Sequence, residues 1–145
     1  MKNVFLVALF AMITVQTFAQ VAVTLMVDMG EQVVSSDGVH VAGEFQGWDP
    51  AATALADDDM DGVWEITLDL PSGTHEYKFI NGMGWDFAED VPPTCQVEVA
   101  GNDNRFLTIE EDATEVSSLI CFASCAACGM STIRMRVDMG VEEAV

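Results

Sequence analysis

Apolar and polar side chains alternate with a period of two through most of the chain beyond residue 20. The segment 63–70 shows the pattern most clearly, because an extended chain would place all its apolar side chains on one face. The apolar set is Trp64, Ile66, Leu68 and Leu70, and the polar set is Glu65, Thr67 and Asp69. No long stretch keeps the i, i+3, i+4 spacing of an amphipathic helix. The pattern therefore predicts an all-β fold.

Short segments with this alternation are separated by turn sequences such as Pro71-Ser72-Gly73. They cover residues 23–27, 39–45, 63–70, 74–80, 95–99, 105–109 and 116–121. The other side chains expected to face inward are Val23, Leu25, Val27, Val39, Val41, Phe45, Tyr77 and Phe79. Glu76 and Lys78 alternate outward, so Lys78 should reach solvent. Many short strands with frequent turns are typical of a β-sandwich, here of about seven strands.

The first nineteen residues read as a signal peptide. Lys2 precedes the apolar run 4–13, and small residues at Thr17 and Ala19 suit a signal-peptidase site. A membrane anchor is the alternative, but the apolar run is well short of the roughly 20 residues that a spanning helix needs. We expect cleavage after Ala19 and a secreted or cell-surface protein without membrane insertion.

A sequence pattern from the beginning of the mature chain is repeated near the end of the sequence. Val23-x-Leu25-x-Val27-Asp28-Met29-Gly30 is matched by Ile133-x-Met135-x-Val137-Asp138-Met139-Gly140. This predicts one sandwich domain over residues 20–129 and, over 130–145, the first strand of a second, truncated repeat. Neighbouring domains of the same chain are therefore expected partners.

The formal charge of −19 narrows the range of partners. Nucleic acids and anionic membrane surfaces are held by Lys and Arg contacts to phosphate, so both are excluded as expected partners. Between residues 20 and 129 the only Lys or Arg side chains are Lys78 and Arg105. Their positions are therefore informative.

Four cysteines, Cys95, Cys121, Cys125 and Cys128, favour disulfides in an exported protein. Three pairings are open, and we favour Cys95–Cys121 with Cys125–Cys128. Zinc held by the four thiolates is the alternative.

A calcium loop is suggested by Asp57, Asp59 and Asp61, whose i, i+2, i+4 spacing before a glycine resembles the first half of an EF-hand. The second half does not fit, because Leu68 stands where a bidentate Glu is needed. A solvated turn is favoured, and we expect no cofactor.

The sequence indicates no enzyme. His40 and His75, the two histidines, lie in predicted strands, and no G-x-S-x-G motif or free thiol accompanies them. Paired carboxylates could hydrolyse glycosides, but in so acidic a chain a plausible pair always exists. A catalytic domain could still lie beyond residue 145.

Two tryptophans interrupt the alternation. Trp48 and Trp85 each follow a glycine in an expected loop. A flat indole face suits the apolar face of a sugar ring; alternatively, both rings cap the core.

Four motifs occur in the order and at the approximate spacing seen in one group of domains. They are the segment 39–48, which ends in Gly47-Trp48, the segment 70–79, which contains Tyr77-Lys78-Phe79, and the pairs Gly84-Trp85 and Asn104-Arg105. Over about residues 22–110 they resemble the starch-binding and glycogen-binding domains of carbohydrate-binding module families 20 and 48. The resemblance implies an immunoglobulin-like β-sandwich.

The resemblance also implies a site for starch- or glycogen-type α-glucan. Trp48 and Trp85 would form its platform, and Lys78 and Asn104 would hydrogen-bond glucose hydroxyls. Gln46 and the cysteine-rich tail depart from the family pattern. The stretch 86–93 departs too, because it is longer and more acidic than the pattern at the second half of the site. The alternative is a structural immunoglobulin-like repeat or protein-interaction module without sugar binding, in which the two tryptophans are buried or point apart.

Overall fold

A computed structural model of the chain describes residues 19–99, 101–126 and 128. The predicted signal peptide and the truncated repeat therefore lie outside the described residues, apart from Ala19, and stay predictions. Within the described ranges, no helix is long and apolar enough to cross a bilayer.

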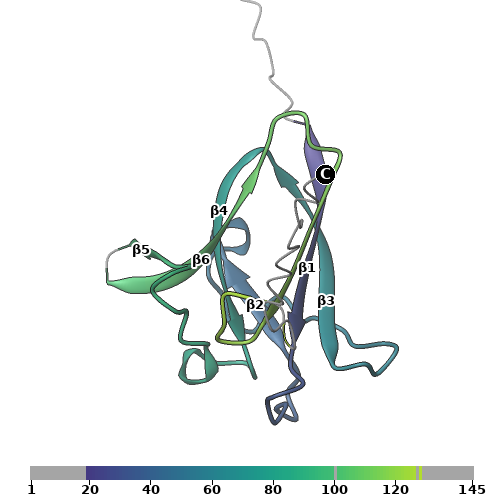
Figure 1. Ribbon diagram of the computed structural model, residues 1–145, viewed down its shortest axis with the longest axis vertical. Helices are drawn as coiled ribbons and strands as arrows, with labels where there is room; N and C mark the ends of the chain where they lie inside the picture. Colours follow the sequence, from purple (N-terminus) through teal and green to yellow (C-terminus); the bar gives the residue numbers. More distant parts are fainter. Residues whose placement is uncertain (1–18, 100, 127, 129–145) are drawn as a thin grey trace, which may run out of the picture.

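Seven strands and two short 3-10 turns, η1 and η2, make up the described fold (Figure 1). The strands are β1 (Gln20–Asp28), β2 (His40–Gly43), β3 (Val63–Pro71), β4 (Gly73–Ile80), β5 (Val97–Val99), β6 (Asn102–Ile109) and β7 (Glu115–Cys121), and the turns are η1 (Glu44–Gln46) and η2 (Trp85–Phe87). One sheet has the order β3-β1-β7 and the other β2-β4-β6-β5. The predicted all-β, immunoglobulin-like sandwich of about seven strands is confirmed.

The core lies between the two sheets and is built from the inward faces of the alternating segments. Its buried members include Val21, Val23, Leu25, Val27, Val39, Val41, Leu70, Tyr77 and Phe79. Trp64, Ile66, Leu68 and Phe45 pack against this set and are partly buried. The predicted inward faces are therefore confirmed, with Phe45 in η1 instead of a strand.

Strand β1 is the central strand of the first sheet. It pairs antiparallel with β3 and parallel with β7, and the second pairing ends with Cys121 opposite Asp28. The first and last strands of the domain thus lie side by side. The cysteine-rich tail leaves β7 at this edge.

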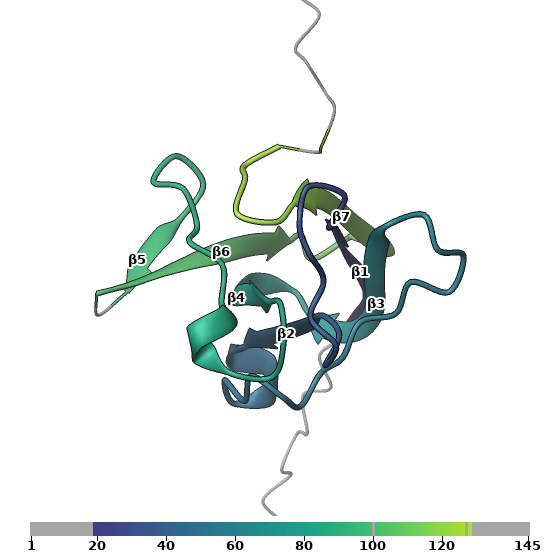
Figure 2. The ribbon, with the colours of Figure 1, turned by 90° about the horizontal axis from the view of Figure 1, so that it is seen from below.

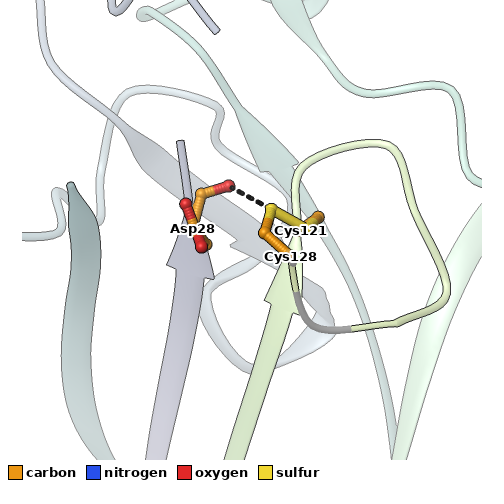
Figure 3. Close-up of side chains that lie close together, drawn as sticks. All are labelled: Asp28, Cys121 and Cys128. Atoms are coloured by element: carbon orange, nitrogen blue, oxygen red, sulfur yellow. Dashed lines mark hydrogen bonds between the residues drawn. A yellow bond between two sulfur atoms is a disulfide. The ribbon is translucent and has the colours of Figure 1, made fainter. Parts of the chain in front are cut away.

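The disulfides differ from the pairing that we favoured. Cys95 is bonded to Cys125, and Cys121 to Cys128. The reason is the turn that follows β7: Cys121 N–H donates to the Ala126 carbonyl, so the chain doubles back and returns Cys128 to Cys121. Figure 3 shows this second bond beside Asp28, whose carbonyl oxygen lies 3.8 Å from Cys128 Sγ. Both bonds together use all four sulfur atoms, so the zinc alternative is wrong.

Candidate sugar-binding site

Trp48 and Trp85 come from separate loops and converge. Trp48 follows η1, and Trp85 is the first residue of η2. Their ring centroids are 6.4 Å apart and the ring planes are tilted by 40°. Trp85 is 48% exposed, and Trp48 is half-buried. The two rings neither cap the core separately nor point apart.

The loops that carry the two tryptophans both leave one strand pair of the second sheet. β2 and β4 are antiparallel, with Gly43 opposite Tyr77 and His40 opposite Ile80. The loops of Trp48 and Trp85 therefore begin at opposite ends of this strand pair and reach toward each other across it. Figure 2 shows both turns on the side of β2 and β4 away from β3.

The backbone at Trp48 has an unusual conformation. Gly47 and Trp48 both have positive φ, 77° and 61°, and the left-handed region is uncommon for a residue with a side chain. The Trp48 N–H donates to the Gly43 carbonyl at 3.0 Å. A non-glycine residue is held in this region only where the surroundings over-determine it, and such residues cluster at functional sites.

Gln46 supplies much of that constraint. Its Nε2 donates to the carbonyl oxygens of Val41 and Asp49, and its Oε1 accepts the Asp49 N–H at 2.7 Å. The side-chain amide thus ties both ends of the Trp48 loop together. Gln46, one of the departures from the family pattern, is therefore the residue that stabilises the Trp48 loop.

The Trp85 loop is braced from inside the domain by Glu89. This carboxylate is fully buried, and its Oε1 accepts N–H groups from Phe79 and from Arg105 Nε, at 2.9 and 2.7 Å. Its Oε2 accepts hydrogen bonds from Arg105 Nη2 and from the Ala123 N–H. One side chain thereby joins the Trp85 loop to β4, β6 and the disulfide-bonded tail.

Lys78 lies opposite Ala42 in the β2–β4 pair, between the starting points of the two loops. Its ammonium donates to Asp103 Oδ1 at 2.9 Å, and its side chain is only 12% exposed. Lys78 therefore has less access to solvent than outward alternation predicts, and its ammonium is paired with Asp103.

Asn104 lies beside this pair but is 7% exposed. Its Nδ2 donates to Glu76 Oε2 at 3.1 Å. The Asn104 side-chain amide is therefore on β6, next to β4, and it is already hydrogen-bonded to the Glu76 carboxylate. Asp103, which sequence reasoning did not single out, is the more accessible neighbour.

The three aspartates suggested for calcium also gather. Oxygen atoms of Asp57, Asp59 and Asp61 lie within 4.8 Å of one another. The Asp57 carboxylate accepts the N–H groups of Asp61 and Gly62 at 3.1 and 3.2 Å. Hydrogen bonds within the turn thus account for its shape, and calcium stays the untested alternative to the expected solvated turn.

Both histidines are buried. His75 Nε2 lies 2.8 Å from the Pro71 carbonyl oxygen, and its Nδ1 lies 3.0 Å from Glu44 Oε1 without hydrogen-bond alignment. Glu44 opens η1, so His75 contacts the turn that leads to Trp48.

The structure is therefore a β-sandwich in which two loop aromatics, Trp48 and Trp85, converge. Residues 33–115, more than half of the chain, match the family described as the glycogen recognition site of AMP-activated protein kinase. The chain belongs to this family of glycogen-recognition carbohydrate-binding modules.

A solved structure agrees with the family. The chain is similar to the glycoside hydrolase family 15 glucoamylase from Hypocrea jecorina, with 25% sequence identity and a TM-score of 0.53. The match covers 79% of this chain and 19% of the glucoamylase chain. No curated protein sequence matches the chain.

Proposed function

We propose that the domain is a non-catalytic module that binds starch- or glycogen-type α-glucan through Trp48 and Trp85. The observation that carries the proposal is the convergence of the two rings from separate loops, with a centroid distance of 6.4 Å and with Trp85 half exposed. Family membership supports the same class of ligand.

The tilt of the rings favours a curved glucan. Consecutive sugars of an α-1,4-linked chain turn relative to each other, so their apolar faces do not lie in one plane. Two indoles tilted by 40° can each follow one sugar of such a chain, whereas a flat β-1,4-linked chain suits coplanar rings. The pair therefore favours α-glucan over cellulose-type ligands.

The bracing of both loops helps binding. Gln46 holds the Trp48 loop and Glu89 holds the Trp85 loop before any ligand arrives. Preorganisation reduces the entropy lost on association. A shallow aromatic platform should still bind weakly, with Kd around 10⁻⁴ M, which is about −5.5 kcal/mol.

The proposal places this module in a secreted protein with further domains. Two disulfides among the described residues suit an oxidising compartment. The similarity to a small part of a glucoamylase chain supports a module that works beside other domains. Removal of residues 1–19 is part of the same proposal.

Calorimetric titration of the full chain with maltoheptaose tests the function. Wild type should bind saturably, and Trp85→Ala should lose binding while its circular dichroism spectrum is unchanged. Leu119→Ala is the matched control, since Leu119 is an exposed apolar side chain, 42% accessible, on the other sheet. Absence of heat from folded wild type at millimolar sugar would contradict the proposal and favour a structural repeat.

A further inference from the structure

The ion pair between Lys78 and Asp103 is unevenly exposed. The Lys78 side chain is 12% accessible and the Asp103 side chain 36%, although Nζ and Oδ1 are only 2.9 Å apart. The carboxylate, and not the ammonium, is therefore the group that this pair presents to solvent. Lys78 lies on β4 between the starting points of the two tryptophan loops, so a ligand on the platform that reaches this pair would meet the carboxylate.

We propose that Asp103 is a sugar-contacting acceptor of this site and that it makes the site selective for uncharged glucan over anionic glycans. Lys78 acts through it as a positioning residue. The inference rests on the proposed function and assigns a role to a residue that neither the sequence pattern nor the family match singles out.

Asp103 has acceptor capacity to spare. Oδ1 accepts one hydrogen bond from Lys78, and Oδ2 accepts one from the Val91 N–H at 2.9 Å. A carboxylate offers about four acceptor positions, so about two remain for sugar hydroxyls. The Lys78 hydrogen bond lowers the pKa of Asp103 below its ordinary value of 3.8, so the group is ionised at neutral pH.

The same contacts fix Asp103 relative to the platform. Val91 follows the segment that carries Trp85, and Lys78 lies on β4, the strand that leads into that segment. Movement of the Asp103 carboxylate would break its hydrogen bond to Lys78 or to the Val91 N–H. It is therefore a preorganised acceptor, which suits recognition of a hydroxyl group.

The charges near the platform explain the selectivity. Asp49 and Asp86 directly follow the two tryptophans, and both are exposed. Among the described residues, Lys78 and Arg105 are the only Lys or Arg side chains, and Arg105 is buried against Glu89. Since Asp103 already neutralises Lys78, the described part of the chain leaves no unpaired Lys or Arg side chain to receive a phosphate, sulfate or carboxylate group.

The test compares two sugars by calorimetry on the full chain, maltoheptaose and maltoheptaose that carries one phosphate. Wild type should bind the neutral sugar and bind the phosphorylated sugar more weakly. Asp103→Asn keeps the shape and one carbonyl acceptor but frees Lys78. It should weaken maltoheptaose binding about tenfold and reduce or reverse the discrimination. Asp69→Asn, an exposed change on β3 in the other sheet, should alter neither affinity.

Equal affinities of Asp103→Asn and wild type for both sugars would overturn the inference while leaving the function intact. No binding of maltoheptaose to wild type would instead remove the function and the inference together. Should Asp103→Asn not fold, Lys78→Met replaces it: this variant leaves the carboxylate unneutralised, so discrimination against the phosphorylated sugar should increase, and an unchanged ratio would overturn the inference.

Discussion

Two ion pairs, Arg105–Glu89 and Lys78–Asp103, each involve a residue of β6, and they differ in burial. Arg105–Glu89 is buried, with side-chain accessibilities of 4% and 0%. Lys78–Asp103 lies at the surface, and its carboxylate is the most accessible of the four charged groups. The Arg105–Glu89 pair is buried and cannot contact a ligand. In the Lys78–Asp103 pair, the Asp103 carboxylate still has unused acceptor positions.

The difference shows how the domain divides support from recognition. Glu89 uses its oxygens on Arg105 and on two backbone N–H groups from distant segments, so the Trp85 loop has a defined position. Asp103 uses only part of its capacity on Lys78 and Val91. Substitution of the buried pair should therefore change stability most, and substitution of the exposed pair should change sugar selectivity.

The largest expected effect on stability comes from Glu89→Ala. The change leaves the Arg105 guanidinium buried without its counter-ion and removes the acceptor from the Phe79 and Ala123 N–H groups. Loss of one partner of a buried pair costs about 3–5 kcal/mol. Urea unfolding followed by circular dichroism measures it. Glu111→Ala, at an exposed position, should change the unfolding free energy by under about 0.5 kcal/mol, and a similar small effect at Glu89 would contradict the bracing role.

Gln46→Ala should have a smaller effect on stability and a clear one on binding. Its side-chain hydrogen bonds around the Trp48 loop are lost, which should destabilise the fold by about 1–2 kcal/mol. The Trp48 loop would then be less ordered before binding, so maltoheptaose affinity should fall several-fold. Gln46→Glu keeps the acceptor oxygen but not the donor and should restore only part of the affinity; equal affinities of Gln46→Ala and wild type would show that the loop needs no brace.

Asp103→Asn should change stability least of the three substitutions. Exposed ion pairs contribute under about 1 kcal/mol, so thermal unfolding at neutral pH should shift only slightly. A loss as large as that of Glu89→Ala would mean that Asp103 is a structural residue and not one kept for the ligand.

The contribution of Asp103 should also depend on pH in one direction. Because the hydrogen bond from Lys78 lowers its folded-state pKa below 3.8, the pair stabilises the fold above pH 3.8 and the stabilisation is lost as pH falls through the lowered pKa. The difference in unfolding free energy between wild type and Asp103→Asn should therefore vanish well below pH 3.8. A difference that persists in acid would contradict this assignment.

The sequence predicted the faces of the strands better than the contacts between loops. Val23, Leu25 and Val27 could be placed because burial of one face of a strand requires alternation. The disulfide pairing could not, because it depends on the turn after β7 that returns Cys128 to Cys121. Local hydrogen bonding in that turn leaves no periodic signal.

The site was predictable only in part, and for similar reasons. Trp48 and Trp85 stood out because each breaks the alternation after a glycine. Asn104 and Asp103 are neighbours, and which of them has its side chain accessible depends on how β6 meets β4 and the Trp85 loop. Glu89 is one of 24 acidic residues, and its only signal was the need of the isolated Arg105 for a partner.

The central claim is that Trp48 and Trp85 form one glucan platform. The chain contains three tryptophans, so its indole N–H resonances in a ¹⁵N-labelled sample report separately on Trp48, Trp85 and the core-packed Trp64. Titration with maltoheptaose should shift the Trp48 and Trp85 resonances along one common binding curve while the Trp64 resonance stays in place. Shifts that miss either loop tryptophan, or that follow two different curves, would contradict a shared platform.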